Sequence, residues 1–127
     1  MTEPTLYKRL GSYDTIAVIT DDFLARLIAH PQMQRFFLGA SESTRTRRRQ
    51  LIVDYLCFKT GGPCAYTGRT MKEAHKGLAI SESDWNILTA LFHDSLQKVN
   101  LPGKEANEIM DLINSTKQDI VAKVESS

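Results

Sequence analysis

The chain has 127 residues, of which 42% are hydrophobic and 24% are charged, and its formal net charge is +1. This length suits one domain with one core, so we expect a single domain over residues 1–127. The near-neutral charge argues against nucleic acid or an anionic membrane as a partner, and no apolar run approaches the roughly 20 residues that cross a bilayer. The polar start, MTEPTLYKRL, lacks the features of a secretory signal, so the sequence predicts a cytoplasmic protein.

The first long helix is indicated by apolar residues three and four positions apart, namely Ile16, Ile19, Phe23 and Leu27. Ser12 or Asp14 is suitably located to cap this helix. Pro31 cannot continue a helix but can open a short turn, which would carry Met33, Phe36 and Phe37. A polar linker, GASEST, is expected after that turn.

A second long helix is predicted from about Arg45 to Phe58, with one apolar face formed by Leu51, Ile52, Tyr55 and Leu56. The TGGP sequence at Thr60–Pro63 ends it. The segment from Pro63 to Thr70 is expected to be a loop, because it has little periodicity and several helix breakers. A short helix follows from Met71 to Lys76, and Gly77 is well placed as its C-terminal glycine.

Cys57 and Cys64 are the only cysteines in the chain. Two thiols without a second pair do not make a zinc framework. In the reducing compartment that we expect, two free thiols are the favoured interpretation. A local disulfide is the alternative, and a mass measurement under non-reducing conditions would distinguish the two.

The third long helix opens with SESDW, in which Ser81 and Asp84 resemble a capping box. Its expected buried side consists of Trp85, Leu88, Leu91, Phe92, Leu96 and Val99. Asn100 and Pro102 mark a turn into a last helix, whose apolar residues run from Ile109 to Val121. No segment shows the alternation of a strand, so the predicted fold class is all-α, with four long helices and short connecting ones.

His75 is one of three histidines, and it lies on the short helix that follows the glycine-rich loop. An ordinary surface or half-buried histidine is one interpretation. However, so short an element buries little area, and neutral imidazole is the usual protein ligand of haem iron. No cysteine or carboxylate accompanies His75 at the spacing of a zinc site. Nearby apolar side chains would suit either a core or a slot for haem, namely Phe36, Phe37, Tyr66, Met71, Leu78, Ile80, Trp85 and Leu88.

Three segments resemble the group I truncated haemoglobins: LYKRLG, DDFLARLIAHPQMQRFF, and GGPCAYTGRTMKEAHKGLAI, which ends just past His75. The last two helices also match that family in length and apolar rhythm. The resemblance implies a two-over-two truncated globin sandwich around haem b, with His75 as the proximal iron ligand. It further implies that Phe37 packs against the porphyrin and that the proximal side and rim are lined by Tyr66, Met71, Leu78 and Ile80.

The distal side of the expected haem site departs from the family pattern. Where the family commonly has Phe-Tyr, this chain has Phe23 and Leu24, and Leu24 cannot donate a hydrogen bond to a bound ligand. A second register would turn Gln50 inward, whereas the first directs three residues toward the iron: Arg48, Leu51 and Ile52. The first register predicts an unusually apolar distal side and therefore faster O2 release than in tyrosine-bearing relatives.

The arginine-rich sequence TRTRRR contains Arg45, Arg47, Arg48 and Arg49. A solvated helix start is one interpretation. Pairing of one or two of these arginines with haem propionates is another, because a guanidinium group matches carboxylate geometry, and Arg69 is a further candidate for this role. A nucleic-acid patch is not favoured, since the net charge is near zero and no recognition-helix pattern accompanies the run.

The favoured function is reversible binding of O2, and of NO or CO, by a five-coordinate ferrous haem, because His30 and His93 are expected to face solvent. NO dioxygenation is the related enzyme activity, and it would need a reductase from another chain because no flavin or nicotinamide fingerprint is present. Weak peroxidase activity and a haem-free helical interaction module are further alternatives. A monomer or weak dimer is expected.

Overall fold

The chain is described by a computed structural model over residues 4–122, and within that range it contains helices and loops but no strand. Along the chain the elements are α1 (Leu6–Leu10), α2 (Ser12–Ala29), the 3-10 helix η1 (Gln34–Phe36), α3 (Glu42–Lys59), α4 (Met71–His75), α5 (Glu82–Lys98), α6 (Gly103–Asn114) and α7 (Lys117–Ile120). The predicted all-α class is confirmed. The first three residues of the polar N-terminal segment lie outside the described range, as do residues 123–127.

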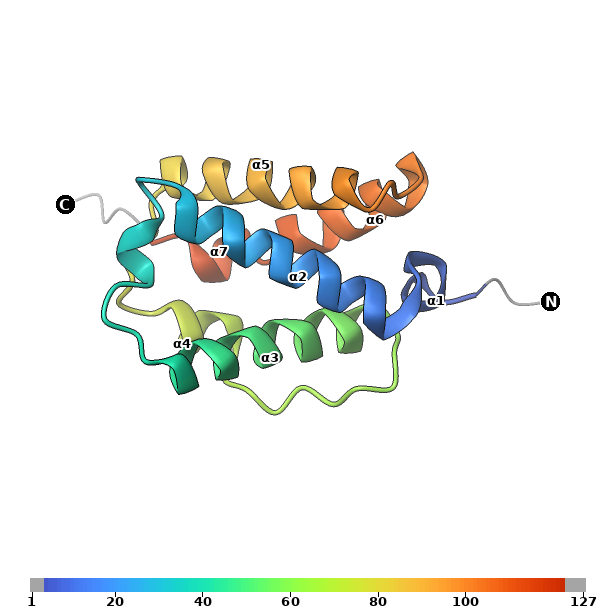
Figure 1. Cartoon of the computed structure of the whole chain (residues 1–127), viewed down its shortest axis with the longest axis horizontal. Helices are drawn as coiled ribbons and strands as arrows, with labels where there is room; N and C mark the ends of the chain where they lie inside the picture. The colour runs from blue at the N-terminus through green and yellow to red at the C-terminus, as the bar shows by residue number, and fades with distance from the viewer. Residues whose placement is uncertain (1–3, 123–127) are drawn as a thin grey trace.

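Figure 1 shows two antiparallel helix pairs packed together, α2 with α3 and α5 with α6. Helix α2 is central, because it packs against both α3 and α5, while the short helices α4 and α7 pack against each other. Buried side chains of these four helices, with Leu10 of α1 and Met33 of the turn after α2, form one hydrophobic cluster: Leu10, Ile16, Ile19, Phe23, Leu27, Met33, Val53, Leu56, Cys57, Phe92, Leu96 and Ile109. Within residues 4–122, none of the helices combines the length and the apolar character that crossing a membrane requires.

Helix α2 begins differently from the prediction. Gly11 is the N-cap, in a left-handed conformation with φ of 112°, and no side chain caps the helix. A Cβ at this position would lie 2.2 Å from the Thr15 hydroxyl oxygen, so both the backbone conformation and the space demand glycine. The predicted caps, Ser12 and Asp14, instead form part of the first turn of the helix.

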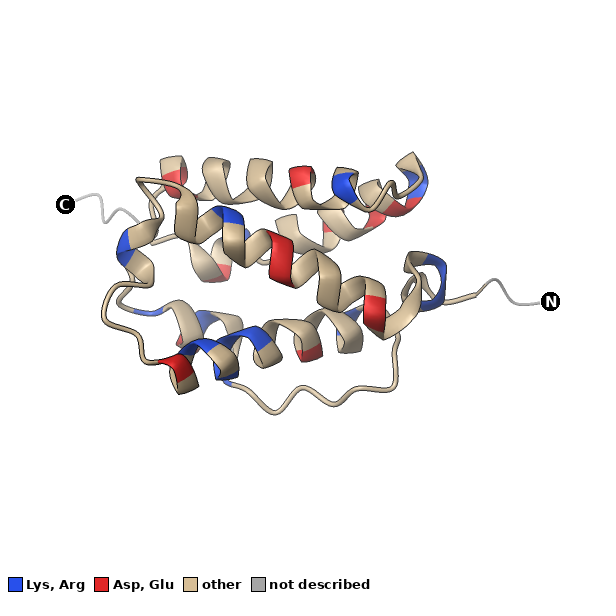
Figure 2. Cartoon of the chain, in the orientation of Figure 1, with Lys and Arg blue, Asp and Glu red and all other residues tan. Residues whose placement is uncertain are grey.

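Helix α3 begins at Glu42, so the second half of the predicted GASEST linker is helical. The reason is Ser41, whose hydroxyl accepts a hydrogen bond from the Thr44 backbone N–H at 3.2 Å and so caps the helix. The first half of α3 is mostly exposed and carries several cationic side chains (Figure 2). Arg49 connects it to α2, because its Nε donates to Asp21 at 2.7 Å.

The predicted capping box at the start of α5 is confirmed. Ser81 accepts from the Asp84 backbone N–H at 3.0 Å, and the Asp84 carboxylate accepts from the Ser81 backbone N–H at 2.9 Å. The fully buried Asp84 carboxylate also accepts hydrogen bonds from Arg35 and Gln32 of the η1 segment. Burial alone would raise the pKa of Asp84, but these donors outweigh it and hold the pKa well below its usual range.

The predicted last helix is divided in two. Ser115 and Thr116 donate their hydroxyls to the carbonyls of Leu112 and Ile113, at 2.5 and 2.6 Å, and these local bonds compete with continuation of the helix. The chain then turns into α7, which packs against α4. Immediately after α7 the Ala122 backbone N–H donates to the Ile80 carbonyl at 2.8 Å. The break therefore brings the end of the described chain to the segment that follows His75.

Candidate functional site

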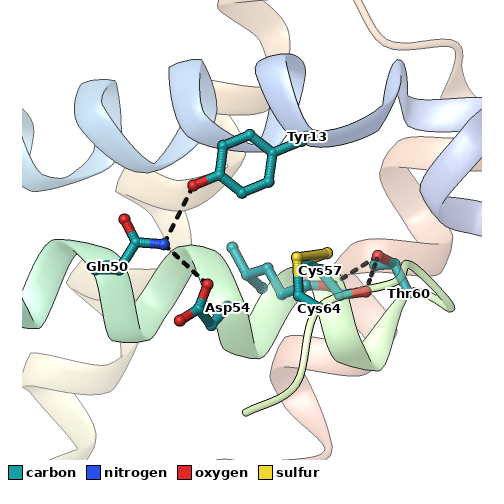
Figure 3. Close-up of a disulfide and its surroundings, with 7 residues drawn as sticks. Tyr13, Gln50, Asp54, Cys57, Thr60 and Cys64 are labelled. Carbon is teal, nitrogen blue, oxygen red and sulfur yellow. Dashed lines mark hydrogen bonds between the residues drawn. A yellow bond between two sulfur atoms is a disulfide. The ribbon is translucent and has the colours of Figure 1, made fainter. Parts of the chain in front are cut away.

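The loop that leads to His75 is covalently attached to α3. Cys57 and Cys64 form a disulfide with a Cα–Cα distance of 5.7 Å, so the favoured expectation of two free thiols was wrong and the alternative holds (Figure 3). Cys57 is fully buried in the last turns of α3, and Cys64 is half-buried in the loop. The bond is possible because the TGGP turn reverses the chain directly beside the end of α3, where the Gly62 backbone N–H donates to the Cys57 carbonyl at 2.8 Å.

Tyr66 is the next contact between this loop and α3. Its ring meets the Tyr55 ring edge to face, with 5.3 Å between the centroids, and its hydroxyl donates to the Arg69 carbonyl at 2.5 Å. Burial raises the pKa of Tyr66, and burial together with the charges of Tyr66 and Asp119 raises the pKa of Tyr55. Tyr55 and Asp119 were not among the predicted site residues. Tyr55 could have been found from the sequence, because it continues the apolar face of Leu51 and Ile52 on the same helix.

His75 is the last residue of α4 and is half-buried. The helix begins where the Thr70 hydroxyl accepts from the Glu73 backbone N–H at 3.1 Å. The Nδ1 atom of His75 lies 2.8 Å from the Met71 carbonyl oxygen. A carbonyl can only accept, so Nδ1 must carry the proton, and the Nε2 lone pair on the far side of the ring is left available to a metal.

The donor set around His75 fits haem better than a metal held by protein ligands alone. In the part of the chain that is described, no group of three or more His, Cys, Asp or Glu side chains is arranged to hold a metal ion. A porphyrin supplies nitrogen ligands of its own, so a single histidine is sufficient as the protein ligand of haem iron. The hydrogen bond to Met71 also fits, because histidines that bind metals usually donate their second ring N–H in this way.

The residues predicted for the proximal side and rim are unequally buried. Met71 is half-buried and contacts His75 through its carbonyl, whereas Ile80 is only 4% exposed. Leu78 is 41% exposed. Arg69 is exposed, and its backbone carbonyl rather than its guanidinium group contacts Tyr66.

The residues predicted for the distal side lie on α2 and α3, whereas Phe37 follows η1 and Leu88, predicted as part of the apolar slot, lies on α5. Phe23 is buried in the core and meets Phe92 of α5 edge to face, with ring centroids 5.1 Å apart. Four predicted residues are partly buried and pack against the same core cluster, namely Leu24, Phe37, Ile52 and Leu88. Leu51 is half-buried next to Ile52. None of these side chains has a polar atom.

Gln50 does not turn inward in the structure. Its side chain is exposed, and its Nε2 donates to the Tyr13 hydroxyl at 3.1 Å and to Asp54 at 2.9 Å (Figure 3). Arg48 is also exposed, but it is directed toward the turn after α2, where it donates to the Phe36 carbonyl at 3.2 Å. Its guanidinium carbon lies 6.0 Å from the centroid of the Phe37 ring, so these two predicted site residues are neighbours.

The other two histidines differ from each other. His93 is exposed, as expected. His30 is half-buried rather than solvent-facing, and its Nδ1 accepts from the Gln32 backbone N–H at 3.2 Å in the turn after α2.

Comparison with known proteins agrees with this geometry. The model of the bacterial-like globin family matches residues 5–122. A group 1 truncated haemoglobin of Mycolicibacterium paratuberculosis is 28% identical over 109 residues, which cover 86% of this chain and 78% of the relative. One from Tetrahymena pyriformis is 25% identical over 124 residues, which cover 97% of this chain and all of the relative.

The fold agrees as well. A crystal structure of the truncated haemoglobin of Tetrahymena pyriformis in its Fe(III) form superposes with a TM-score of 0.86 at 23% identity, over 94% of this chain and 100% of that one. At this identity the likeness shows the fold alone, whereas the family match spans nearly all of the chain. The half-buried His75 on a short helix, the two antiparallel helix pairs and the match over residues 5–122 together show that the chain belongs to the bacterial-like globin family.

Proposed function

We propose that the protein binds haem b with His75 as the iron ligand and that it binds O2, and also NO and CO, reversibly. The observation that carries the proposal is the hydrogen bond from His75 Nδ1 to the Met71 carbonyl, which leaves Nε2 available on a half-buried ring. Membership in a globin family is consistent with haem-based gas binding. When bound, ferrous haem would supply an open coordination position for a diatomic gas.

On the proximal side, the chain contributes one nitrogen donor and fixes its direction. The hydrogen bond to the Met71 carbonyl restrains rotation of the His75 ring. Ile80 and Met71 supply apolar surface beside this donor. Together these residues would hold and orient the group.

On the distal side, we propose that Leu24, Leu51 and Ile52 face the ligand. These residues offer no hydrogen-bond donor, and Gln50 is engaged with Tyr13 and Asp54. A ligand that gains negative charge on binding is therefore left without a charge-assisted hydrogen bond, a contribution of about 1.5–3 kcal/mol. We expect rapid release of O2 and a smaller penalty for CO.

Arg48 is proposed to hold a haem propionate near Phe37, and Arg69 is proposed for the same role. Arg48 is exposed, and its guanidinium group donates a hydrogen bond to the neutral backbone carbonyl of Phe36. Exchange of that carbonyl for a carboxylate would form a charge-assisted hydrogen bond, which is the stronger kind.

Absorption spectra of His75→Ala and His93→Ala test the proposal, because His93 is an exposed histidine that serves as a matched control. Protein supplied with haem should show a Soret band in the wild type and in His93→Ala. In His75→Ala the band should be lost or strongly shifted. Equal spectra for the two variants, or a colourless wild type, would contradict the proposal.

Three further expectations belong to the proposal. We propose a cytoplasmic monomer or weak dimer, and we propose that any sustained turnover of NO with O2 depends on a reductase supplied by another chain. Centrifugation at several protein concentrations tests whether the protein is a monomer or a weak dimer. Nitrate formation with and without an added reductase tests the last one.

A further inference from the structure

The Cys57–Cys64 disulfide lies where the loop leaves α3, and the chain is fitted closely around it (Figure 3). A Cβ added at Gly62 would lie 2.7 Å from the Cys57 sulfur and 2.6 Å from the Tyr7 ring. Glycine is therefore needed for the backbone to pass directly over the buried sulfur. The side chain of Cys64 then returns to that sulfur from a half-buried position against the core.

The segment after this point has few hydrogen bonds to the rest of the described chain. We call residues 65–79 the His75 arm, because they carry α4 and His75. Within the described chain, residues 63–69 make no hydrogen bond to another element, the Tyr66 ring meets the Tyr55 ring of α3, and α4 packs against α7. The far end of the arm is held where Ile80 is buried and its carbonyl accepts from Ala122. The disulfide is thus the strong link at the near end.

We propose that Cys57–Cys64 is a reversible thiol–disulfide site whose state sets how firmly the His75 arm is held. This inference rests on the proposed haem binding for its consequence, which is slower loss of haem when the bond is closed. A closed bond limits the motions of residues 65–75, and His75 is the last of these. An open bond removes the covalent link at the near end of the arm and leaves non-covalent contacts there, among them the aromatic contact of Tyr66.

The reductant that fits this site is a small dithiol. Cys57 is 0% exposed, so a thiolate must attack the sulfur of Cys64, the half-buried partner. That step breaks the Cys57–Cys64 bond and forms a mixed disulfide with Cys64, while Cys57 leaves as a thiolate and takes up a proton. The second thiolate of the reductant then attacks the reductant's first sulfur, the one bonded to Cys64 in the mixed disulfide. Cys64 leaves as a thiolate and takes up a proton. Two electrons pass to the protein, and the dithiol ends as a cyclic disulfide.

The test uses the full chain, with and without haem, in its oxidised form and after reduction by dithiothreitol. Two quantities are measured: the rate of haem transfer to excess apomyoglobin, and amide hydrogen exchange over residues 65–75 by mass spectrometry. Because local opening controls exchange, reduction should speed exchange of the arm by about three- to tenfold and should speed haem transfer in the same range. Exchange in α5 should stay unchanged.

Cys64→Ser supplies the matched control, since its half-buried side chain can be replaced without opening the fully buried Cys57 site. This variant should behave like the reduced wild type, and dithiothreitol should have no effect on it. The comparison of oxidised and reduced wild type needs no substitution, so it decides the question even if the variant folds poorly.

Equal rates of amide hydrogen exchange in the arm of the oxidised and reduced wild type would overturn the inference. So would a mass that shows two free thiols after treatment with a reagent that oxidises thiols to disulfides. If the arm responds to reduction but no haem is retained by either form, the attachment of the arm stands and the proposed function fails. If haem binds but the rates of hydrogen exchange in the arm and of haem transfer are the same in the oxidised and reduced protein, the proposed function stands and this inference fails.

Discussion

At the scale of single residues, the chemistry expected of the site depends on which side chains carry a donor. His75 has one ring nitrogen engaged by a backbone carbonyl, and this leaves the other available. Leu24 lies partly buried against the core on α2, where a tyrosine would carry a hydroxyl into the same region. The proposed contrast between a distal side without donors and an oriented histidine therefore depends on these few atoms.

Leu24→Tyr is therefore expected to slow O2 release. If the new hydroxyl donates to the ligand, a gain of about 1.5–3 kcal/mol corresponds to about ten- to hundredfold slower dissociation. Leu24→Phe adds the same ring without the hydroxyl and controls for bulk. Laser flash photolysis and stopped-flow mixing measure the rates, and CO release should change far less. Similar slowing in both variants would show that ring size, not hydrogen bonding, is responsible.

At the scale of elements, polar contacts determine where helices begin and how they pair. Ser41 starts α3 earlier than periodicity alone suggests, and Asp84 joins α5 to the turn after α2. Asp22 likewise joins two elements, α2 and α5. It accepts from Arg26 on its own helix at 2.6 Å and from Lys98 of α5 at 3.1 Å. Burial by itself raises the pKa of Asp22, but hydrogen bonds from Arg26, Ser95 and Lys98 outweigh it and lower the pKa to about 2.

This shift predicts a pH-dependent contribution to stability. The folded pKa of Asp22 lies below the ordinary value of 3.8, so its contribution is fully present above pH 4 and is lost as the pH falls toward 2. Asp22→Asn should lower the free energy of unfolding by about 1–2 kcal/mol at pH 7 and by less near pH 2. Urea unfolding at several pH values measures this. Asp111→Asn, at an exposed position on α6, should show little effect at any pH.

At the scale of the whole molecule, the candidate site is assembled from segments far apart in the sequence. The helix pairs supply a rigid frame, while α4 is a five-residue helix held between the disulfide at one end and the α7 segment at the other. Many of the apolar residues expected around a haem are only partly buried in the described chain. A ligand that covers them should therefore stabilise the fold as a whole.

Haem is expected to raise the global stability of the protein by mass action. At a free haem concentration a hundredfold above its dissociation constant, the free energy of unfolding should increase by about 2.7 kcal/mol. Urea unfolding with and without haem measures the increase, and His93→Ala should retain it. In His75→Ala most of the increase should disappear. An equal gain in both variants would indicate that haem binds without coordination by His75.

The local features of this fold could be read from the sequence because each depends on residues close together in the chain. The period of apolar residues predicted α2, α3 and α5, and Ser81 with Asp84 predicted the start of α5, since a capping box spans only four residues. The segment around His75 was recognisable for the same reason, being a continuous run with its own glycines and threonine cap. Its match to a globin family followed from that run and the helices on either side.

Other features were decided only by tertiary structure, because they depend on distances between segments. Cys57 and Cys64 are paired because the TGGP turn folds back over the end of α3, and nothing in their spacing required it. Gln50 is exposed and donates to Tyr13 because α2 and α3 pack in one particular register. The last helix is divided where α7 can reach α4, and the period of apolar residues in the sequence does not predict that contact. The sequence by itself determined the helices and the histidine, whereas packing between helices determined what surrounds that histidine, because side-chain direction depends on neighbours that the chain meets only after folding.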